Sequence, residues 1–505
     1  MAGESPGVAE RKKEPEEAAT ERPAAAGQQA PAEPEAAAEQ KAPAGREAPP
    51  AERPAPAPET APAPAPAEQR TATEQPAPLD LLAQLTNRPA PPPSPARTAA
   101  RRLKIWAPLV LLLAVLLGIA QLLRPLPDPR FTVAGDPYTF TGEAFSMPWP
   151  EEGQAAARVV GVGSLGTHGE QKPVPTASVA KVMTAYVILK GHPLKSGEEG
   201  EPITIDATAA KEAGAQEESR VEVSEGQTYT RFQMLQMLLI PSGNNIARQL
   251  ARWDAGSEDA FVKKMNEAAE ELGMDDTTYT DPSGLDASTV STAADQVKLA
   301  EEVMKNDVLR KIVRMPNADV PGLPGRIYNN NDDLLVSNPG GLGIKTGSSR
   351  PAGGTLMWAA KRTIEGKERL IVGATMAQRQ AGSDDANAHL KVVKERSYKM
   401  IKAVQDALVP ATVVRKGDVV GYVDDGLGGR TSVVATADLR AVGWGGLKAK
   451  LELIPGGGGI PRAAGAGTDV GALAVGTGPG RAQVPVALQK DMAAPGAGAK
   501  LTRLG

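Results

Sequence analysis

The stretch Pro175-Thr-Ala-Ser-Val-Ala-Lys-Val-Met-Thr184 places Ser178 and Lys181 three residues apart. Apolar residues fill most of Ala177–Lys190 and Gly191 follows, which predicts a buried helix with a glycine C-cap. Residues three apart on a helix share one face, and backbone N–H groups of a first turn stabilise developing negative charge. A buried lysine can lose its proton and act as a base. The stretch therefore predicts a serine nucleophile that a lysine activates.

Composition excludes several other kinds of site. The chain of 505 residues has no cysteine and three histidines, His168, His192 and His389. Without cysteine there are no disulfides, thiolate metal sites or cysteine nucleophiles. His192 and His389 have no partner pattern and are predicted to be non-catalytic. Basic and acidic residues nearly balance, 56 against 60, which gives no indication of nucleic-acid binding. We expect no metal, no cofactor and no nucleic acid.

Two further motifs follow along the chain. Ser242-Gly243-Asn244 comes after a predicted apolar helix, and Lys345-Thr346-Gly347 ends a predicted strand. A second Lys-Ser-Gly, at Lys195–Gly197, lies in an acidic turn and is treated as a chance match. Taken singly, each motif is more often a surface lysine, a loop cap or a turn glycine. Their order and contexts together favour a catalytic site.

The three motifs together resemble those of the penicillin-binding proteins and serine β-lactamases. The wider sequence is similar to the low-molecular-mass D-alanyl-D-alanine carboxypeptidases over about residues 145–408. The stretches that carry this similarity are Pro175–Thr184, Leu238-Leu-Ile-Pro-Ser-Gly-Asn-Asn245, Met265-Asn266, Leu272-Gly-Met274, Thr280-Asp-Pro-Ser-Gly-Leu285, Ser291-Thr292, Gly343-Ile-Lys-Thr-Gly-Ser348 and Ala352-Gly353.

The resemblance implies a catalytic role for four polar residues. Ser178 is expected to be the acylated nucleophile and Lys181 the base that takes its proton. Ser242 is expected to relay a proton to the leaving D-alanine. Asn244 is expected to hydrogen-bond the peptide of the substrate.

The resemblance implies that the third motif binds substrate. Lys345 and Thr346 are expected to hold the terminal carboxylate, and the backbone N–H groups of Ser178 and Ser348 to form the oxyanion hole. Gly347 leaves the strand without a side chain, so that a peptide can pair alongside it. A candidate outside the motifs is Arg379, which fits a further carboxylate ligand or a surface arginine equally well.

The expected fold is α/β (α+β), of the serine β-lactamase and DD-peptidase type. An antiparallel sheet flanked by helices lies beside a helical subdomain, with the site between them. The predicted helices are Ala177–Lys190, Arg231–Ile240, Asp259–Leu272, Thr292–Met304 and Ala386–Ala407, and the predicted strands are Leu342–Thr346, Thr355–Ala360 and Leu370–Met376.

Composition divides the chain into five segments. These are a Pro, Ala and Glu-rich disordered tail (1–96), a basic flank with a transmembrane signal anchor (97–124), a linker (125–144), the catalytic domain (145–408) and a Gly-rich β module (411–505). Strands of the module are predicted at Val413–Val423, Thr431–Ala437 and Leu447–Ile454.

One segment predicts a membrane span. Ile105–Leu123 carries no charge and, as a helix, is about 28 Å long, close to the hydrocarbon thickness of a bilayer. Basic residues are more frequent before it than after it, which predicts a cytoplasmic N-terminus and an extracellular catalytic domain in a bacterial cell membrane. A buried helix and a cleaved signal peptide fit less well.

The predicted function is a membrane-anchored serine D-Ala-D-Ala carboxypeptidase that acts on peptidoglycan stem peptides and is acylated by β-lactams. Three alternatives use the same motifs: an endopeptidase on cross-links, a β-lactamase, and a peptidoglycan-binding or scaffolding protein without turnover. No glutamate stands in a recognisable deacylation loop, which disfavours the β-lactamase. The tail leaves room for an unknown cytoplasmic partner.

Overall fold

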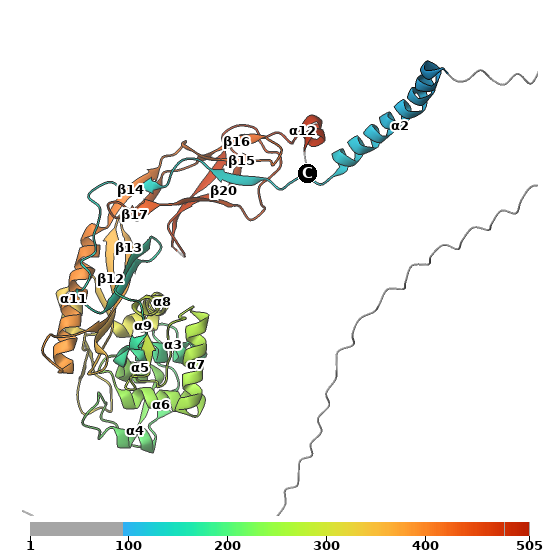
Figure 1. Cartoon of the computed structure of the whole chain (residues 1–505). Coiled ribbons are helices and arrows are strands. Elements are labelled where there is room, and N and C mark those ends of the chain that lie inside the picture. Colours follow the sequence, from blue (N-terminus) through green and yellow to red (C-terminus); the bar gives the residue numbers. More distant parts are fainter. Residues whose placement is uncertain (1–93, 479, 504–505) are drawn as a thin grey trace, which may run out of the picture. The chain divides into compact units, whose positions relative to one another are not determined.

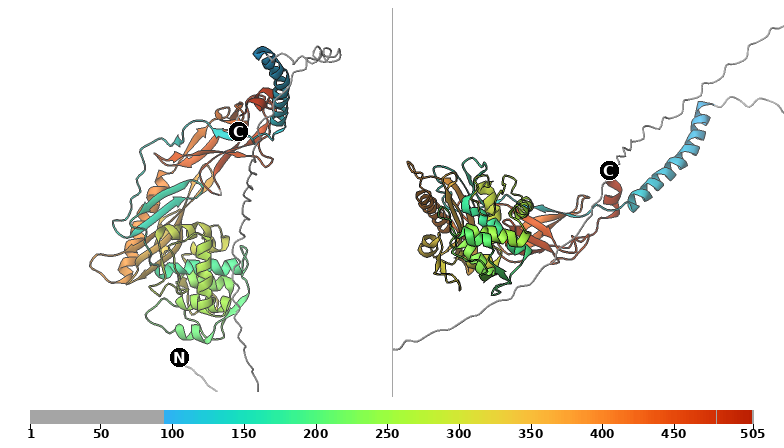
Figure 2. Two further views of the ribbon diagram at one scale, coloured as in Figure 1. Left: turned by 45° about the vertical axis from the view of Figure 1, so that its right-hand side comes forward. Right: turned by 90° about the horizontal axis from the view of Figure 1, so that it is seen from below.

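The protein is described by a computed structural model of residues 94–478 and 480–503 (Figure 1). The tail predicted over residues 1–96 lies outside the described residues, except for Ser94–Ala96. From there the chain forms an apolar helix, a mixed α/β domain and a β-rich module, all drawn in Figure 2 from two further sides.

The first described element is helix α2 (Pro95–Leu123), which contains the predicted membrane span. The Ser94 side chain caps its start by accepting a hydrogen bond from the N–H of Arg97. None of its residues is buried, and its length and composition suffice to cross a membrane. An apolar helix of this kind is consistent with a membrane anchor.

An antiparallel sheet forms the centre of the α/β domain. Its strand order is β11-β12-β13-β3-β4. Three of the strands form the predicted meander, and β3 and β4, which precede Ser178, were not predicted. The bounds are β11 (Gly341–Ser349), β12 (Gly353–Ile364), β13 (Lys367–Gln378), β3 (Gln154–Val159) and β4 (Gly163–His168).

Small residues explain why β3 was missed. Its centre is Ala155-Ala156-Ala157, and alanine is depleted in strands. All three alanines are buried, and the strand packs against helix α8 (Ala293–Val303). Tertiary packing against a close neighbour therefore outweighs the weak local preference.

Helices cover both faces of the sheet. Met357 and Ala359 of β12 join the core that the helical subdomain shares, whereas Leu356 and Trp358 join the core beneath α11 (Ala386–Ala407). This alternation is the period of two that a strand imposes on its side chains. Figure 1 shows α11 and the helical subdomain on opposite sides of these strands.

The predicted helices are confirmed apart from a few residues at their ends and the start of the first, which begins at Lys181 and not at Ala177. The helical subdomain contains α3 (Lys181–Gly191), α4 (Ala207–Glu212), α5 (Arg231–Leu239), α6 (Asn244–Ala255), α7 (Glu258–Glu271) and α9 (Asp307–Val313), and α10 (Asp332–Ser337) precedes β11. Short strand pairs complete the domain: β5 (Val174–Pro175) with β8 (Val290–Ser291), β6 (Pro202–Thr204) with β7 (Thr228–Thr230), and β9 (Asn317–Ala318) with β10 (Ile327–Tyr328).

The β module contains a six-stranded sheet of order β1-β15-β16-β21-β20-β19. The predicted strand Val413–Val423 is two strands, because Gly417 turns the chain at a φ of 88°. The bounds are β14 (Val409–Val414), β15 (Val419–Asp424), β16 (Arg430–Ala435), β17 (Leu439–Gly443), β18 (Lys448–Ala449), β19 (Leu451–Pro455), β20 (Asp469–Val475) and β21 (Ala482–Leu488), followed by α12 (Ala497–Thr502).

The prediction of a linker over residues 125–144 is corrected, because two strands lie within this range. β1 (Arg130–Val133) pairs antiparallel with β15, and β2 (Tyr138–Thr139) pairs with β18. Phe140 is buried in the core of the module. Such short strands are held by pairing with a segment nearly 300 residues away, which no local pattern can indicate.

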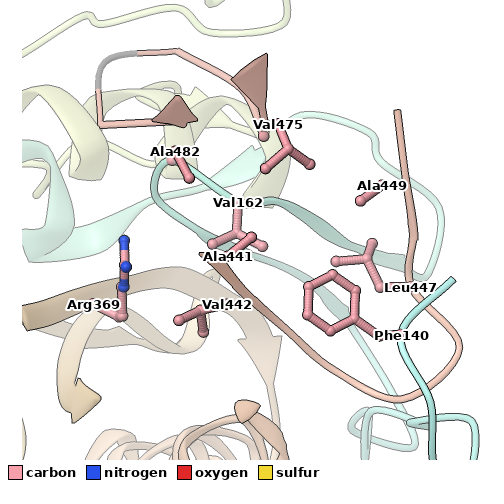
Figure 3. Close-up of a pocket in the computed structure, with 11 residues that line it drawn as sticks. Phe140, Val162, Arg369, Ala441, Val442, Leu447, Ala449, Val475 and Ala482 are labelled. Atoms are coloured by element: carbon pink, nitrogen blue, oxygen red, sulfur yellow. The ribbon is translucent and has the colours of Figure 1, made fainter. Parts of the chain in front are cut away.

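The module also contacts the α/β domain. Val442 and Trp444 pack into the core beneath α11, and Arg440 forms an ion pair with Glu365 at the turn between β12 and β13. A small apolar cavity beside these contacts is lined by residues of both parts, including Phe140 and Val162 (Figure 3). None of the predicted site residues lines it.

We predict that Trp358→Ala lowers the free energy of unfolding by about 3–5 kcal/mol, because this large side chain is fully buried. Its ring occupies the space beside Gly373, where a Cβ would lie 2.1 Å from it, and its Nε1–H donates to Thr375 at 3.1 Å. The measurement is thermal and urea unfolding of the full chain in detergent, followed by circular dichroism. Trp149→Ala is the control, since Trp149 is only half-buried; equal losses in the two variants would contradict the prediction.

Candidate active site

Ser178 lies in a 3-10 turn, and Lys181, three residues later, is the first residue of the helix α3 that follows it. The turn η1 spans Ala177–Ala180, which corrects the predicted α-helical start at Ala177. A 3-10 helix has three residues per turn, so side chains three apart eclipse each other. The Nζ of Lys181 accordingly lies 2.9 Å from the Oγ of Ser178 and donates to it. The local helix type thus makes the serine–lysine contact.

Lys181 is completely buried. Burial and, after it, the charge of Lys345 lower the pKa of Lys181 well below its ordinary value, while Asp281 opposes them. A lowered pKa makes the neutral amine accessible, and a neutral amine can accept a proton from a serine hydroxyl. The structure therefore supplies the physical condition for a lysine base.

A loop beneath α3 holds the lysine in place. The carbonyl of Ser283 accepts a hydrogen bond from Lys181 Nζ at 2.8 Å, and the carbonyl of Pro282 accepts one from Thr184 at 2.6 Å. Gly284 has a φ of 77°, and a Cβ there would lie 1.8 Å from the carbonyl oxygen of Ala177. The stretch Thr280–Leu285, for which the sequence alone indicates no role, thus supports the site from below α3.

The second motif lies at the junction of two helices. Pro241 follows the end of α5, and Ser242 then turns the chain into α6 with a φ of 69°, a conformation that non-glycine residues adopt at some energetic cost. The buried Oγ of Ser242 has no hydrogen-bond partner within residues 94–478 and 480–503. Buried hydroxyls without a partner are rare in folded proteins and call for an explanation.

Asn244 is the first residue of α6. Its Nδ2 donates to Glu218 at 2.6 Å, and its buried Oδ1 has no partner in the described part of the chain. Glu218 is itself paired with Arg248 at 2.7 Å. Burial opposes ionisation of Glu218, but the hydrogen bonds from Arg248 and Asn244 outweigh it and lower its pKa. Glu218 was missed from the sequence, because it lies in a loop that shows no motif.

The third motif lies on β11 and is buried. Lys345 and Thr346 are 1% and 2% exposed. The Nζ of Lys345 donates to the carbonyl of Thr346 at 2.9 Å, and burial lowers the pKa of Lys345 to about 7. A buried lysine of this kind gains most from an anionic partner, because the anion restores its charged form.

Gly347 brings β11 against Ser178. A Cβ at this position would lie 2.8 Å from the backbone N of Ser178 and 2.6 Å from Thr355 Oγ1, so only glycine fits. Thr355 Oγ1 donates to the carbonyl of Thr176 at 2.9 Å and ties β12 to the residues before η1. Ser348 follows, half-buried. The close approach places the strand and the 3-10 turn side by side.

The three predicted motifs meet around Lys181. Its pKa responds to the charges of Lys345 on β11, of Arg248 on α6 and of Glu218, which contacts Asn244. Residues of all three motifs therefore lie in one region of the structure.

Residues outside the motifs have other contacts. The guanidinium of Arg379 donates to the carbonyls of Arg350 and Pro351 and so braces the turn between β11 and β12. His192 lies 2.9 Å from Asp254, and the buried His389 accepts from the N–H of Gln380. No hydrogen bond among the described residues links either histidine to a motif residue.

Most of the α/β domain matches one protein family in sequence. The family model described as D-alanyl-D-alanine carboxypeptidase matches residues 165–378. A D-alanyl-D-alanine carboxypeptidase of Streptomyces sp. strain K15 is 30% identical over 227 residues, which are 42% of this chain and 76% of that protein. The chain belongs to the D-alanyl-D-alanine carboxypeptidase family.

A second relative and a solved structure show how far the similarity extends. DacB2 of Mycobacterium tuberculosis is 38% identical over 203 residues, 39% of this chain and 65% of that protein, so the match leaves about a third of that relative uncovered. The crystal structure of a peptidoglycan synthesis regulatory factor (PBP3) from Streptococcus pneumoniae superposes with a TM-score of 0.52 at 21% identity, over 69% of this chain and all of that one. The expected DD-peptidase fold is thereby confirmed.

We predict that Gly284→Ala slows acylation of the protein by a fluorescent penicillin at least tenfold. The added methyl group must displace the Ala177 carbonyl, and a displacement near 1 Å at a reacting group has effects of this size or larger. The measurement is the rate of labelling in a gel assay.

The matched control is Gly273→Ala. Gly273 also has a positive φ, 66°, but a Cβ there meets nothing within 4 Å. It carries the same backbone cost without the collision. Equal labelling rates for the two variants would show that the close approach at Gly284 is unimportant.

Proposed function

We propose that the protein is a membrane-anchored serine D-Ala-D-Ala carboxypeptidase that trims peptidoglycan stem peptides. The observation that carries this proposal is the 2.9 Å contact between Ser178 Oγ and the buried Nζ of Lys181, with Gly347 of β11 against the backbone of Ser178. Membership of the carboxypeptidase family supports the reaction and the substrate class.

Acylation begins at Ser178. The neutral amine of Lys181 accepts the hydroxyl proton as Ser178 Oγ attacks the carbonyl carbon of the D-Ala-D-Ala bond. Negative charge develops on the carbonyl oxygen, where the backbone N–H groups of Ser178 and Ser348 stabilise it. The carbon–nitrogen bond then breaks, and Ser242 passes a proton to the leaving amine. D-Alanine departs, and water hydrolyses the remaining ester.

Three side chains and one strand edge hold the substrate during these steps. Lys345, in its charged form, and Thr346 bind the terminal carboxylate, and the side chain of Asn244 hydrogen-bonds the peptide of the substrate. The edge of β11 offers its backbone to the extended peptide, because Gly347 has no side chain. β-Lactams present a carboxylate and a strained amide to the same groups and acylate Ser178.

The proposed membrane topology rests on the basic residues beside the apolar helix. Residues 97–124 anchor the protein, and the four basic residues before the apolar run, Arg97, Arg101, Arg102 and Lys104, keep the N-terminus in the cytoplasm. The catalytic domain, residues 145–408, and the β module, residues 411–505, then face the peptidoglycan outside. Residues 1–96 remain available to a cytoplasmic partner.

The test is release of D-alanine from a peptide that ends in D-Ala-D-Ala. We expect the full chain in detergent to release it and Ser178→Ala to lose at least a thousandfold in rate, because the nucleophile is removed. Both proteins should have the same unfolding temperature. If the chain cleaves only cross-linked dimers, the endopeptidase alternative replaces the proposal; if it is acylated by penicillin but cleaves neither, a wall-binding role does.

We predict a bell-shaped dependence of kcat/KM on pH. Lys181 must be neutral to accept the proton of Ser178, so kcat/KM rises as the pH rises through the lowered pKa of Lys181. Lys345 must be charged to bind the substrate carboxylate, so kcat/KM falls as the pH rises through the Lys345 pKa of about 7. In Lys345→Arg the guanidinium stays charged, and the alkaline limb should move to higher pH. An alkaline limb that stays in place would assign it to another group.

A further inference from the structure

The carboxylate of Asp281 organises the loop beneath α3. Its Oδ2 accepts hydrogen bonds from the backbone N–H groups of Ser283 and Leu285, at 3.1 and 3.0 Å, and from the Ser283 hydroxyl at 2.6 Å. Its Oδ1 accepts one from the hydroxyl of Thr289, also at 2.6 Å. Hydrogen bonds to a carboxylate are stronger than those between neutral groups. A side chain that accepts all of these fixes the course of the loop.

These contacts lie on both sides of the peptide unit that holds Lys181. The carbonyl of Ser283 accepts from Lys181 Nζ at 2.8 Å and belongs to the planar unit between Ser283 and Gly284. One N–H group on Asp281 Oδ2 comes from the peptide unit before this one, and the other comes from the unit after it. Because both neighbouring units are bound to the same oxygen, the carbonyl between them is kept pointing at the lysine.

The direction of this carbonyl constrains the amine. A carbonyl oxygen only accepts hydrogen bonds, so it binds an N–H of Lys181 whether the amine is charged or neutral. In the neutral amine, an N–H directed at Ser283 leaves the lone pair free to face another group. Ser178 Oγ lies 2.9 Å from the same Nζ. The position of the Ser283 carbonyl therefore helps to set the direction from which Lys181 accepts a proton.

The other oxygen of Asp281 extends the link to the residues before Ser178. Thr289, whose hydroxyl donates to Oδ1, is fully buried, and its carbonyl accepts from the backbone N–H of Thr176 at 3.0 Å. Thr176 directly precedes the 3-10 turn η1, which contains Ser178. Asp281 is thus connected to both members of the serine–lysine pair, through the loop on one side and through Thr289 on the other.

We propose that Asp281 is a positioning residue for the acyl-transfer reaction: its carboxylate fixes the Ser283 carbonyl, which holds the amine of Lys181 toward Ser178. This inference rests on the proposed function of the site. Within residues 94–478 and 480–503, no hydrogen bond joins Asp281 directly to Ser178 or Lys181. Asp281 therefore acts through the loop and through its charge.

The charge of Asp281 adds a signature in the pH dependence. Burial, Lys345 of β11 and Arg248 of α6 lower the pKa of Lys181. Two carboxylates, those of Asp281 and Glu218, raise it. Removing the negative charge at position 281 therefore lowers the pKa of Lys181 further. Because Lys181 must be neutral to accept the serine proton, the rising limb of the pH profile then moves to lower pH. A residue that only kept the loop folded would leave this limb in place.

Asp286, on the same loop, provides a matched control. Its Oδ1 accepts from the backbone N–H of Ser288 at 2.8 Å, a local contact of the same kind as that between Asp281 and the N–H of Ser283. Asp286 is exposed, and it is not among the charges that chiefly shift the pKa of Lys181. Replacing Asp286 therefore removes a carboxylate from the loop without releasing the Ser283 carbonyl.

The experiment compares Asp281→Asn, Asp281→Ala and Asp286→Ala with the wild type, as full chains in detergent. The readouts are the unfolding temperature, kcat/KM for D-alanine release and the rate of acylation by a fluorescent penicillin, the last two as functions of pH. Asp281→Ala should lower both rates at their pH optimum by about ten- to hundredfold, because a displaced carbonyl misdirects the amine. Asp286→Ala should stay within about twofold of the wild type at every pH.

Asp281→Asn separates the charge from the loop. Asparagine has nearly the size of aspartate, and its amide oxygen can still accept from the N–H groups of Ser283 and Leu285. We expect Asp281→Asn to keep most of the acylation rate at the optimum. Its rising limb should move to lower pH by about 0.5–1 unit, since a nearby negative charge is gone.

Three outcomes would contradict these proposals. Equal acylation rates in Asp281→Ala and Asp286→Ala, or a rising limb that stays in place in Asp281→Asn, overturn the inference and leave Asp281 a purely structural residue. If Asp281→Ala does not fold, the pH profile of Asp281→Asn decides alone. A wild-type protein that is acylated without releasing D-alanine overturns the carboxypeptidase proposal instead, while the pH dependence of acylation still decides the role of Asp281. A wild-type protein that is not acylated at all overturns both.

Discussion

The site depends on one buried amine. Lys181 has no exposed surface, and its Nζ lies between the hydroxyl of Ser178 and the carbonyl of Ser283. Burial of a charged ammonium is costly, and the protein avoids much of that cost by favouring the neutral form. The core around α3 excludes water, the loop below supplies an acceptor, and the second buried lysine, Lys345, disfavours the charge further.

Close approach of backbone segments is the second constraint. Gly284 lies under the Ala177 carbonyl and Gly347 lies beside the Ser178 amide, and neither position has room for a Cβ. Ala177 and Ser242 adopt positive φ values of 46° and 69°. Such conformations persist only where the surrounding structure compensates for their cost, and here they lie next to Ser178 and at the start of the second motif. The helices and strands around the site are regular, and their packing keeps Ala177 and Ser242 in these unfavourable conformations.

The β module is assembled from both ends of the described chain. Strand β1, which follows the apolar helix, pairs with β15, and residues from β17 pack beneath α11. The chain therefore leaves α2 through the module before it enters the α/β domain. The module therefore follows the apolar helix α2 directly in the chain, whereas the predicted site residues lie on η1, α3, α6 and β11.

The sequence by itself determined the features that depend on neighbours in the chain. The spacing of Ser178 and Lys181, the apolar run of α2 and the bounds of α11 follow from local periodicity and composition. The tertiary structure decided what depends on distant partners. The alanine-rich β3, the short β1 and the contact of Glu218 with Asn244 leave no local pattern, because each is stabilised by a segment remote in sequence. The depressed pKa of Lys181 belongs to this second group, since burial is a property of the folded core and not of four consecutive residues.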